Sequence, residues 1–128
     1  MKILLAEDDD NIVAVAKLAL ERLGGHIVTR VADGVAAVEM GLQESYDVIL
    51  LDSMMPKKDG IRACYELKQE HQISTPIIFL SAKSQESDIR EGLANGAIGY
   101  IQKPFDPKTI SKQVEAILDS LPAQKAAA

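Results

Sequence analysis

Short apolar runs alternate along the chain with longer segments in which apolar residues recur every three or four positions. Short runs are typical of strands, and runs without polar interruption are typical of strands buried on both faces of a parallel sheet. The pattern predicts strands at Lys2–Ala6, Ile27–Val31, Val48–Leu51, Ile77–Leu80 and Ala97–Ile101.

The segments that follow each strand predict five amphipathic helices. Their apolar faces run from Ile12 to Leu23, Val35 to Leu42, Ile61 to Leu67, Ile89 to Leu93 and Ile110 to Leu121. We expect Asp10 or Asn11 to cap the first helix, and capping is also a plain structural role for Asp9. The fourth helix, expected to start at Ser84, has the thinnest apolar face and should be the least firmly anchored. The dipeptide Asp106-Pro107 predicts the start of the last helix, as a cap followed by proline at the first helical position.

Alternation of strand and helix predicts an α/β fold, in which a five-stranded parallel sheet is doubly wound with five helices. The 128 residues fit one domain, which we place at residues 1–122. Residues 123–128, mostly alanine, are expected to be a disordered tail or a remnant of a cloning vector.

Composition narrows the class of protein. A net charge of −5 argues against direct binding of nucleic acid, which needs a basic surface. Cys64 is the only cysteine, so no internal disulfide is possible and a reducing compartment is expected. The first apolar run is too short for a signal peptide, and no run has the length of a membrane span. These observations predict a cytoplasmic protein that does not bind membranes.

Polar side chains follow four of the predicted strands. Glu7-Asp8, Asp52, Ser81 and Lys103 each come where a strand ends, and the carboxyl ends of parallel strands share one edge of the sheet. Each residue alone has a plain structural explanation, such as a helix cap, a loop hydrogen bond or a solvated cation. Together they predict a site. Three carboxylates without histidine or cysteine favour Mg²⁺ over zinc.

The order of these motifs resembles the receiver domain of two-component response regulators, including the chemotaxis regulators, from Lys2 to about Leu121. The matching segments are Glu7-Asp8, the loop Asp52-Ser53-Met54-Met55-Pro56-Lys57-Lys58-Asp59-Gly60, Leu80-Ser81-Ala82-Lys83, and Gly99-Tyr100-Ile101-Gln102-Lys103-Pro104-Phe105. The resemblance implies a flavodoxin-like sheet of strand order 2-1-3-4-5 and a cis bond before Pro104.

The resemblance also implies a magnesium site next to a phosphoacceptor. Asp52 would accept a phosphoryl group from a phosphohistidine on a sensor histidine kinase or a phosphotransfer protein. Asp8, Asp52 and the backbone carbonyl of Met54 would bind Mg²⁺ directly, and Glu7 would act mainly through a metal-bound water. Such a domain is a signalling switch that catalyses its own phosphoryl transfer and dephosphorylation, and it is not a metabolic enzyme.

Switching is implied by the same resemblance. Ser81 and Lys103 would each bind a phosphoryl oxygen, and the Ser81 hydroxyl would move toward the phosphoryl group while Tyr100 swings inward. The surface of the fourth helix, fifth strand and fifth helix would then bind a downstream effector protein or a fused output domain. The chain departs from the usual receiver pattern at two places. Ser53 replaces the usual apolar residue and is expected to loosen its loop slightly, and Ala97-Ile98-Gly99 lacks the aspartate pair of many dimeric DNA-binding regulators.

Three other interpretations remain. A Mg²⁺-dependent phosphohydrolase with an aspartyl nucleophile usually carries a second acid two residues on, where this chain has Met54. A flavin-binding protein on a similar sheet needs a phosphate-binding loop rich in Ser, Thr and Gly after the first strand, where this chain has acids. A degenerate receiver that only binds partners would lack some of Asp8, Asp52, Ser81 and Lys103, and all four are present.

Overall fold

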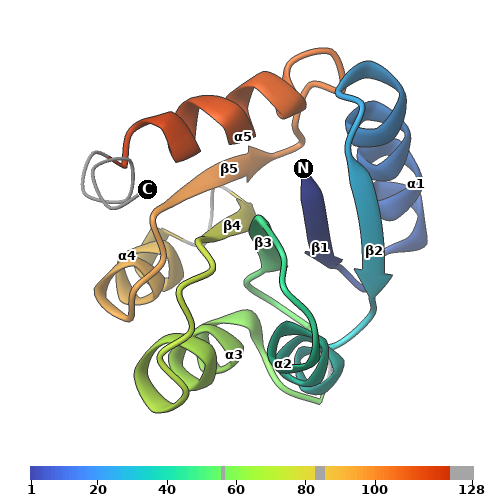
Figure 1. The fold of residues 1–128 in the computed structure, drawn as a ribbon. Coiled ribbons are helices and arrows are strands. Elements are labelled where there is room, and N and C mark those ends of the chain that lie inside the picture. The colour runs from blue at the N-terminus through green and yellow to red at the C-terminus, as the bar shows by residue number, and fades with distance from the viewer. Residues whose placement is uncertain (56, 83–85, 122–128) are drawn as a thin grey trace.

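A five-stranded parallel sheet forms the centre of the molecule (Figure 1). The computed structural model describes residues 1–55, 57–82 and 86–121. The strands lie in the order β2-β1-β3-β4-β5, which confirms the predicted order. Their bounds are β1 Lys2–Ala6, β2 Ile27–Val31, β3 Val48–Asp52, β4 Ile77–Ala82 and β5 Gly99–Lys103.

Helices cover both faces of the sheet, which confirms the doubly wound architecture. Helices α1 and α5 lie on one face, and α2, α3 and α4 lie on the other (Figure 1). Two of the helices continue as short π-helical turns, η1 and η2. The bounds are α1 Asp10–Leu18, η1 Ala19–Leu23, α2 Gly34–Gln43, α3 Gly60–Tyr65, η2 Glu66–Glu70, α4 Glu86–Ala94 and α5 Ile110–Asp119.

Alternation along each strand divides the core into two clusters. Because successive side chains of a strand point to opposite faces, Ile3 and Leu5 pack with α1 and α5, whereas Leu4 packs with α2 and α3. All five residues of β3 are buried. The central strand therefore has apolar contacts on both faces, and the polar Asp52 at its end is held at a fixed place.

The fourth helix has the thin apolar face that the sequence predicts. Ile89 is buried, whereas Leu93 is 39% exposed. Gly92 allows α4 to approach the sheet, because a Cβ atom there would lie 2.1 Å from Cε2 of Phe79. The predicted start at Ser84 lies outside the described residues.

Two helix starts differ from the prediction. Asp9, and not Asp10 or Asn11, caps α1, and its carboxylate accepts hydrogen bonds from the backbone amides of Asn11 and Ile12. The last helix begins at Ile110 with Thr109 as the N-cap residue, one turn after Asp106-Pro107. The Asp106 carboxylate accepts from Lys108 N at 2.8 Å, and the backbone oxygen of Asp106 accepts from Ile110 N at 3.0 Å, so the Asp-Pro dipeptide forms a turn that leads into the helix.

The fifth strand also starts two residues later than predicted. Pairing with β4 begins at Gly99 opposite Ile78 and continues to Lys103 opposite Ala82. This strand lies at the edge of the sheet, where Ile101 is buried and Tyr100 is exposed. Because only one face of β5 is buried, its residues do not form a continuous apolar run, and the run Ala97–Ile101 therefore misplaced the strand. The cis bond between Lys103 and Pro104 is present as expected.

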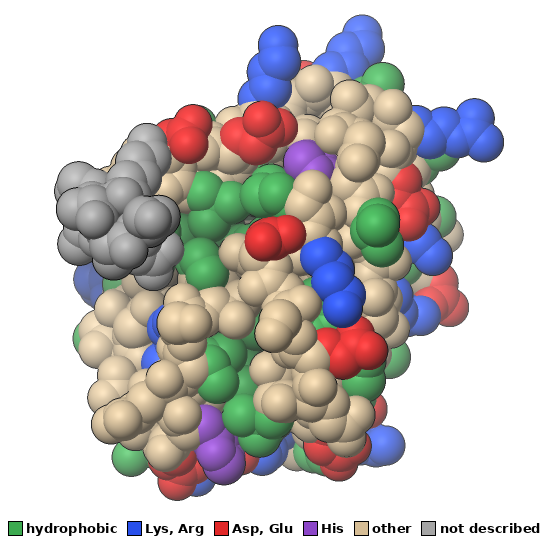
Figure 2. Space-filling model, in the orientation of Figure 1, with side chains coloured by type: hydrophobic (Ala, Val, Ile, Leu, Met, Phe, Trp, Pro, Cys, Tyr) green, Lys and Arg blue, Asp and Glu red, His purple; other side chains and the backbone are tan. Residues whose placement is uncertain are grey.

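Charged side chains on the face drawn in Figure 2 are scattered, with basic groups among acidic ones. No basic patch gathers on the described part of that face, which agrees with the negative net charge. None of the described helices combines the length and the apolar content that a membrane crossing needs.

Candidate functional site

Three carboxylates meet at the carboxyl edge of the sheet. Glu7 and Asp8 follow β1 directly, and Asp52 is the last residue of β3. One carboxylate oxygen from each of the three lies within 4.8 Å of the others. The structure therefore brings together the acidic residues that the sequence placed at one edge.

The Lys103 ammonium lies between two of these carboxylates. Its Nζ atom is 2.6 Å from Oε1 of Glu7 and 3.2 Å from Oδ1 of Asp52. The Lys103 side chain is 17% exposed, so both ion pairs are well shielded from water. The side chain of the last residue of β5 thus crosses β4 to reach the ends of β1 and β3.

Burial and charge alter the protonation of this pair. Burial raises the pKa of Glu7 to about 7, although the contact with Lys103 acts to lower it. Burial alone would lower the pKa of Lys103, but the hydrogen-bonding contact with Glu7 and the charge of Asp52 raise it overall. The lysine therefore stays charged, and Glu7 is close to its titration point at neutral pH.

Backbone contacts fix the two buried acids. Glu7 N donates to Val31 O at 3.1 Å, and Oε2 of Glu7 accepts from Asp9 N at 3.2 Å. Oδ1 of Asp52 accepts from Met54 N at 3.2 Å. Asp8, by contrast, is exposed on the surface, so its carboxylate is free to turn toward a bound cation.

The donor set fits Mg²⁺. Oε1 of Glu7 is buried and, among the described residues, has the ion pair with Lys103 but no properly oriented hydrogen-bond donor. A buried carboxylate oxygen without a hydrogen bond is costly, and a metal-bound water would supply one. Three carboxylates with open space beside them match the hard oxygen ligands that Mg²⁺ takes together with water.

The Ser81 hydroxyl lies at the end of β4 and is fully buried. Its Oγ is 3.2 Å from Oγ of Ser53 and 3.5 Å from the backbone oxygen of Ala82. The contact with Ser53 was not predicted. Its signal in the sequence was a hydroxyl directly after a buried strand, in a position expected to be apolar.

The other two predicted site residues have exposed side chains. The side chain of Met54 is 61% exposed, and Tyr100 is 47% exposed on β5. Met54 takes part through its backbone amide, which binds Asp52. Tyr100 points away from the core, so its predicted inward movement would start from an exposed position.

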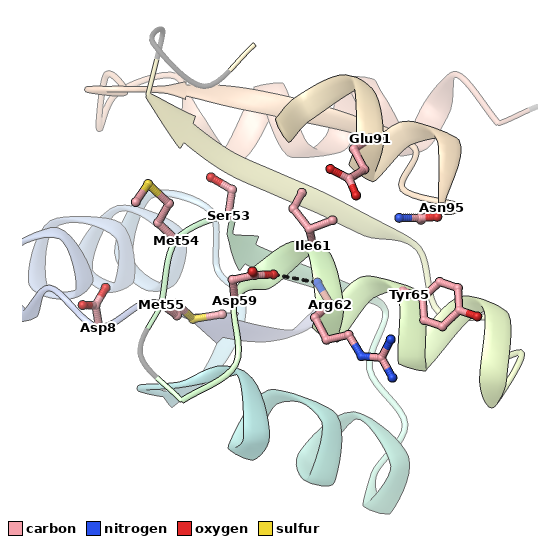
Figure 3. A pocket seen from close by; sticks show the side chains of 10 residues that line it. All are labelled: Asp8, Ser53, Met54, Met55, Asp59, Ile61, Arg62, Tyr65, Glu91 and Asn95. Atoms are coloured by element: carbon pink, nitrogen blue, oxygen red, sulfur yellow. Dashed lines mark hydrogen bonds between the residues drawn. The ribbon is translucent and has the colours of Figure 1, made fainter. Parts of the chain in front are cut away.

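A pocket of about 990 Å³ opens beside the cluster, between α3 and α4. Asp8, Ser53 and Met54 form the end next to the acids, and Tyr65 and Asn95 lie at the opposite end (Figure 3). The pocket therefore reaches Ser53, the residue that follows Asp52 at the end of β3.

The sequence profile of the response regulator receiver domain matches residues 3–115. The chain belongs to this family. It is 41% identical over 117 residues to the alkaline phosphatase synthesis transcriptional regulatory protein PhoP of Bacillus subtilis, covering 91% of this chain and 48% of that protein. It is 39% identical to the transcriptional regulatory protein SrrA of Staphylococcus aureus, covering 91% of this chain and 47% of that protein. The chain thus spans about half the length of these curated relatives.

Solved receiver structures have the same fold. A putative response regulator from Chloroflexus aurantiacus superposes with a TM-score of 0.83 at 30% identity, over 92% of this chain and 97% of that one. The chemotaxis response regulator CheY4 of Vibrio cholerae superposes with a TM-score of 0.81 at 30% identity, over 91% of this chain and 97% of that one. The receiver is therefore a signalling module, and its fold and function class are confirmed.

Proposed function

We propose that Asp52 is the phosphoacceptor of this receiver, and that its donor is a phosphohistidine on a sensor histidine kinase or a phosphotransfer protein. The observation that carries the proposal is the contact of one ammonium, Lys103, with the buried Asp52 inside a three-carboxylate cluster. Phosphoryl transfer depends on positioning and on neutralisation of charge. This cluster offers a nucleophile, a cation and a place for a metal ion at one point.

In the reaction, a carboxylate oxygen of Asp52 forms a bond to phosphorus while the bond from phosphorus to the donor imidazole nitrogen breaks. The electron pair of that bond returns to the imidazole. Oδ1 of Asp52 is held by Met54 N and faces Lys103, which fixes the plane of the carboxylate for attack. Lys103 then stabilises the charge on the phosphoryl oxygens, and the Ser81 hydroxyl donates to one of them.

The residues that would hold Mg²⁺ are Asp8, Asp52 and the backbone carbonyl of Met54, with Glu7 acting through a bound water. Mg²⁺, when bound, neutralises phosphoryl oxygens and orients them. Glu7 lies 2.6 Å from Lys103, so this acid also keeps the ammonium at the site. The cluster within 4.8 Å supports this assignment.

Signal output would follow from movement of Ser81 and Tyr100 on phosphorylation. The surface formed by α4, β5 and α5 would then change its affinity for a downstream effector protein or a fused output domain. The exposed Tyr100 on an edge strand and the thinly anchored α4 support this site of change. Three relatives are named transcriptional regulatory proteins and are about twice as long, which supports a fused output domain after a receiver of residues 1–122 in the cytoplasm.

A mass measurement tests the acceptor. The protein is incubated with Mg²⁺ and acetyl phosphate, and intact mass is recorded for wild type, Asp52→Asn and the matched control Asp10→Asn. Asp10 is an exposed acid that pairs with Arg30 outside the cluster. Wild type and the control should gain one phosphoryl group, and Asp52→Asn should not. Equal labelling of all three proteins would exclude Asp52 as the acceptor. In a separate assay, steady hydrolysis of a phosphate monoester would favour the phosphohydrolase interpretation.

A further inference from the structure

A pair of buried hydroxyls links the end of β3 to the end of β4. Oγ of Ser53 lies 3.2 Å from Oγ of Ser81, and the two residues are 2% and 0% exposed. Figure 3 shows the Ser53 side chain directed from the end of β3 toward β4. The hydroxyl proposed to bind the phosphoryl group therefore already has a hydrogen-bond partner in the unphosphorylated receiver.

The backbone holds Ser53 rigidly in this place. Ser53 N donates to Leu80 O at 3.2 Å, and Ser53 O accepts from Gly60 N at 3.0 Å. Gly60 has no room for a side chain, because a Cβ atom there would lie 2.9 Å from Cα of Ser53. Since both sides of the residue are fixed, its hydroxyl is a preorganised partner for Ser81. The contact joins the loop after Asp52 to β4. The sequence had suggested that Ser53 loosens this loop slightly.

A serine hydroxyl has a single proton to donate. Either hydroxyl can donate in the contact of Ser53 with Ser81, and Ser81 can also donate to Ala82 O at 3.5 Å. Whichever hydroxyl donates, Oγ of Ser81 has to leave Ser53 when it moves to a phosphoryl oxygen on Asp52. A bond present before phosphorylation and lost after it favours the unphosphorylated arrangement.

We propose that Ser53 is a positioning residue that restrains the Ser81 hydroxyl and so opposes the switch to the phosphorylated arrangement. This inference rests on the proposed role of Ser81 at the phosphoryl group. Loss of one neutral hydrogen bond corresponds to about a 2- to 10-fold change in an equilibrium. Ser53→Ala should therefore bind a phosphoryl analogue about 2- to 10-fold more tightly than wild type.

The test is a titration with beryllofluoride in excess Mg²⁺, an analogue of the phosphoryl group on a carboxylate. Binding is followed by amide chemical shifts of β5 and α5 in wild type, Ser53→Ala, Ser81→Ala and the double variant. The gain from Ser53→Ala should disappear when Ser81 is already alanine, because Ser53 acts through that hydroxyl. Ser53→Thr, which keeps a hydroxyl, should return the affinity to that of wild type.

The outcomes separate this inference from the proposed function. Unchanged or weaker binding by Ser53→Ala, or an equal gain in the Ser81→Ala background, would overturn the role of Ser53. Asp52→Asn in the same titration should bind no beryllofluoride. If wild type and Asp52→Asn bind alike, the proposed acceptor is wrong, whereas normal dependence on Asp52 with no effect of Ser53 contradicts only the positioning role. Thermal melts of each variant identify any that fails to fold.

Discussion

Removal of the Lys103 ammonium should leave two buried carboxylates without their cation. The variant Lys103→Met keeps the length and much of the volume of the side chain. Glu7 is 1% exposed and Asp52 is 4% exposed, so water cannot take over the role of the ammonium. The expected result in metal-free buffer is a large loss of stability.

The distances between the charged atoms set the size of the expected loss of stability. At an effective dielectric constant of about 20, contacts of 2.6 and 3.2 Å correspond to gross attractions of about 6 and 5 kcal/mol, which desolvation of the ammonium largely offsets. Carboxylate oxygens within 4.8 Å repel by at least about 3.5 kcal/mol under the same assumption. Breaking a buried ion pair on one side typically costs about 3–5 kcal/mol. We expect a loss of about 3–4 kcal/mol at pH 8.

The loss should be smaller at lower pH. The pKa of Glu7 is raised from 4.5 to about 7, so the folded protein binds this proton more tightly than the unfolded chain. This group therefore contributes most to stability below pH 4.5, and its contribution falls as the pH rises to about 7. Between pH 6 and 8 wild type should lose about 1 kcal/mol through Glu7. The loss should be larger in the variant, because the missing ammonium no longer favours the charged form of Glu7.

Urea unfolding at pH 6 and pH 8 in EDTA measures both quantities. Lys2→Met is the matched control, because Lys2 forms an exposed ion pair with Glu44 at 3.0 Å and such pairs contribute about 0–1 kcal/mol. Mg²⁺ should stabilise Lys103→Met more than wild type, since the metal supplies the missing positive charge. A variant that is no less stable than the Lys2 control, with equal losses at the two pH values, would refute the electrostatic argument.

Three further outcomes are expected. Asp52→Asn should raise the melting temperature in metal-free buffer, because one of three clustered charges is removed. Mg²⁺ should stabilise this variant less than wild type. A lower melting temperature together with an equal response to Mg²⁺ would contradict the cluster. Lys103→Met should still accept a phosphoryl group, more slowly, but its amide shifts around Tyr100 and in α4 should not follow those of phosphorylated wild type. Gly92→Ala should cost about 1–3 kcal/mol in urea unfolding, because its Cβ would lie 2.1 Å from the Phe79 ring, and a variant as stable as wild type would mean that α4 shifts freely.

The buried strands could be predicted because their residues carry the signal themselves. Val48 to Leu51 are fully buried, and a continuous apolar run has no other stable place in a protein of this size. The end of β5 could not be predicted in the same way, since Gln102 and Lys103 belong to an edge strand with one exposed face. Pattern alone cannot tell an edge strand from a central one, because the distinction depends on which strands pair.

The residue that caps the first helix could not be predicted from the local sequence alone. Asp9, Asp10 and Asn11 are all good caps, and the choice among them depends on a partner far along the chain. Arg30 draws the Asp10 carboxylate to 2.9 Å, which leaves Asp9 to bind the first amides of α1. Only the pairing of β1 with β2 brings Arg30 to this place.

The site shows the same division between what single residues reveal and what only packing reveals. Glu7, Asp8, Asp52 and Lys103 could be predicted because each carries a charge at a strand end, where an apolar explanation is absent. Ser53 carries no charge, and in the sequence it reads as one polar residue in a loop. Its meaning depends on Leu80 O and Gly60 N, which fix its backbone, and on the Ser81 hydroxyl 3.2 Å away. A family motif describes residues one position at a time, whereas the restraint on Ser81 depends on a pair of residues, Ser53 and Ser81, at the ends of two strands. Pairs of this kind are where receivers that share the same charged residues can differ in how readily they switch.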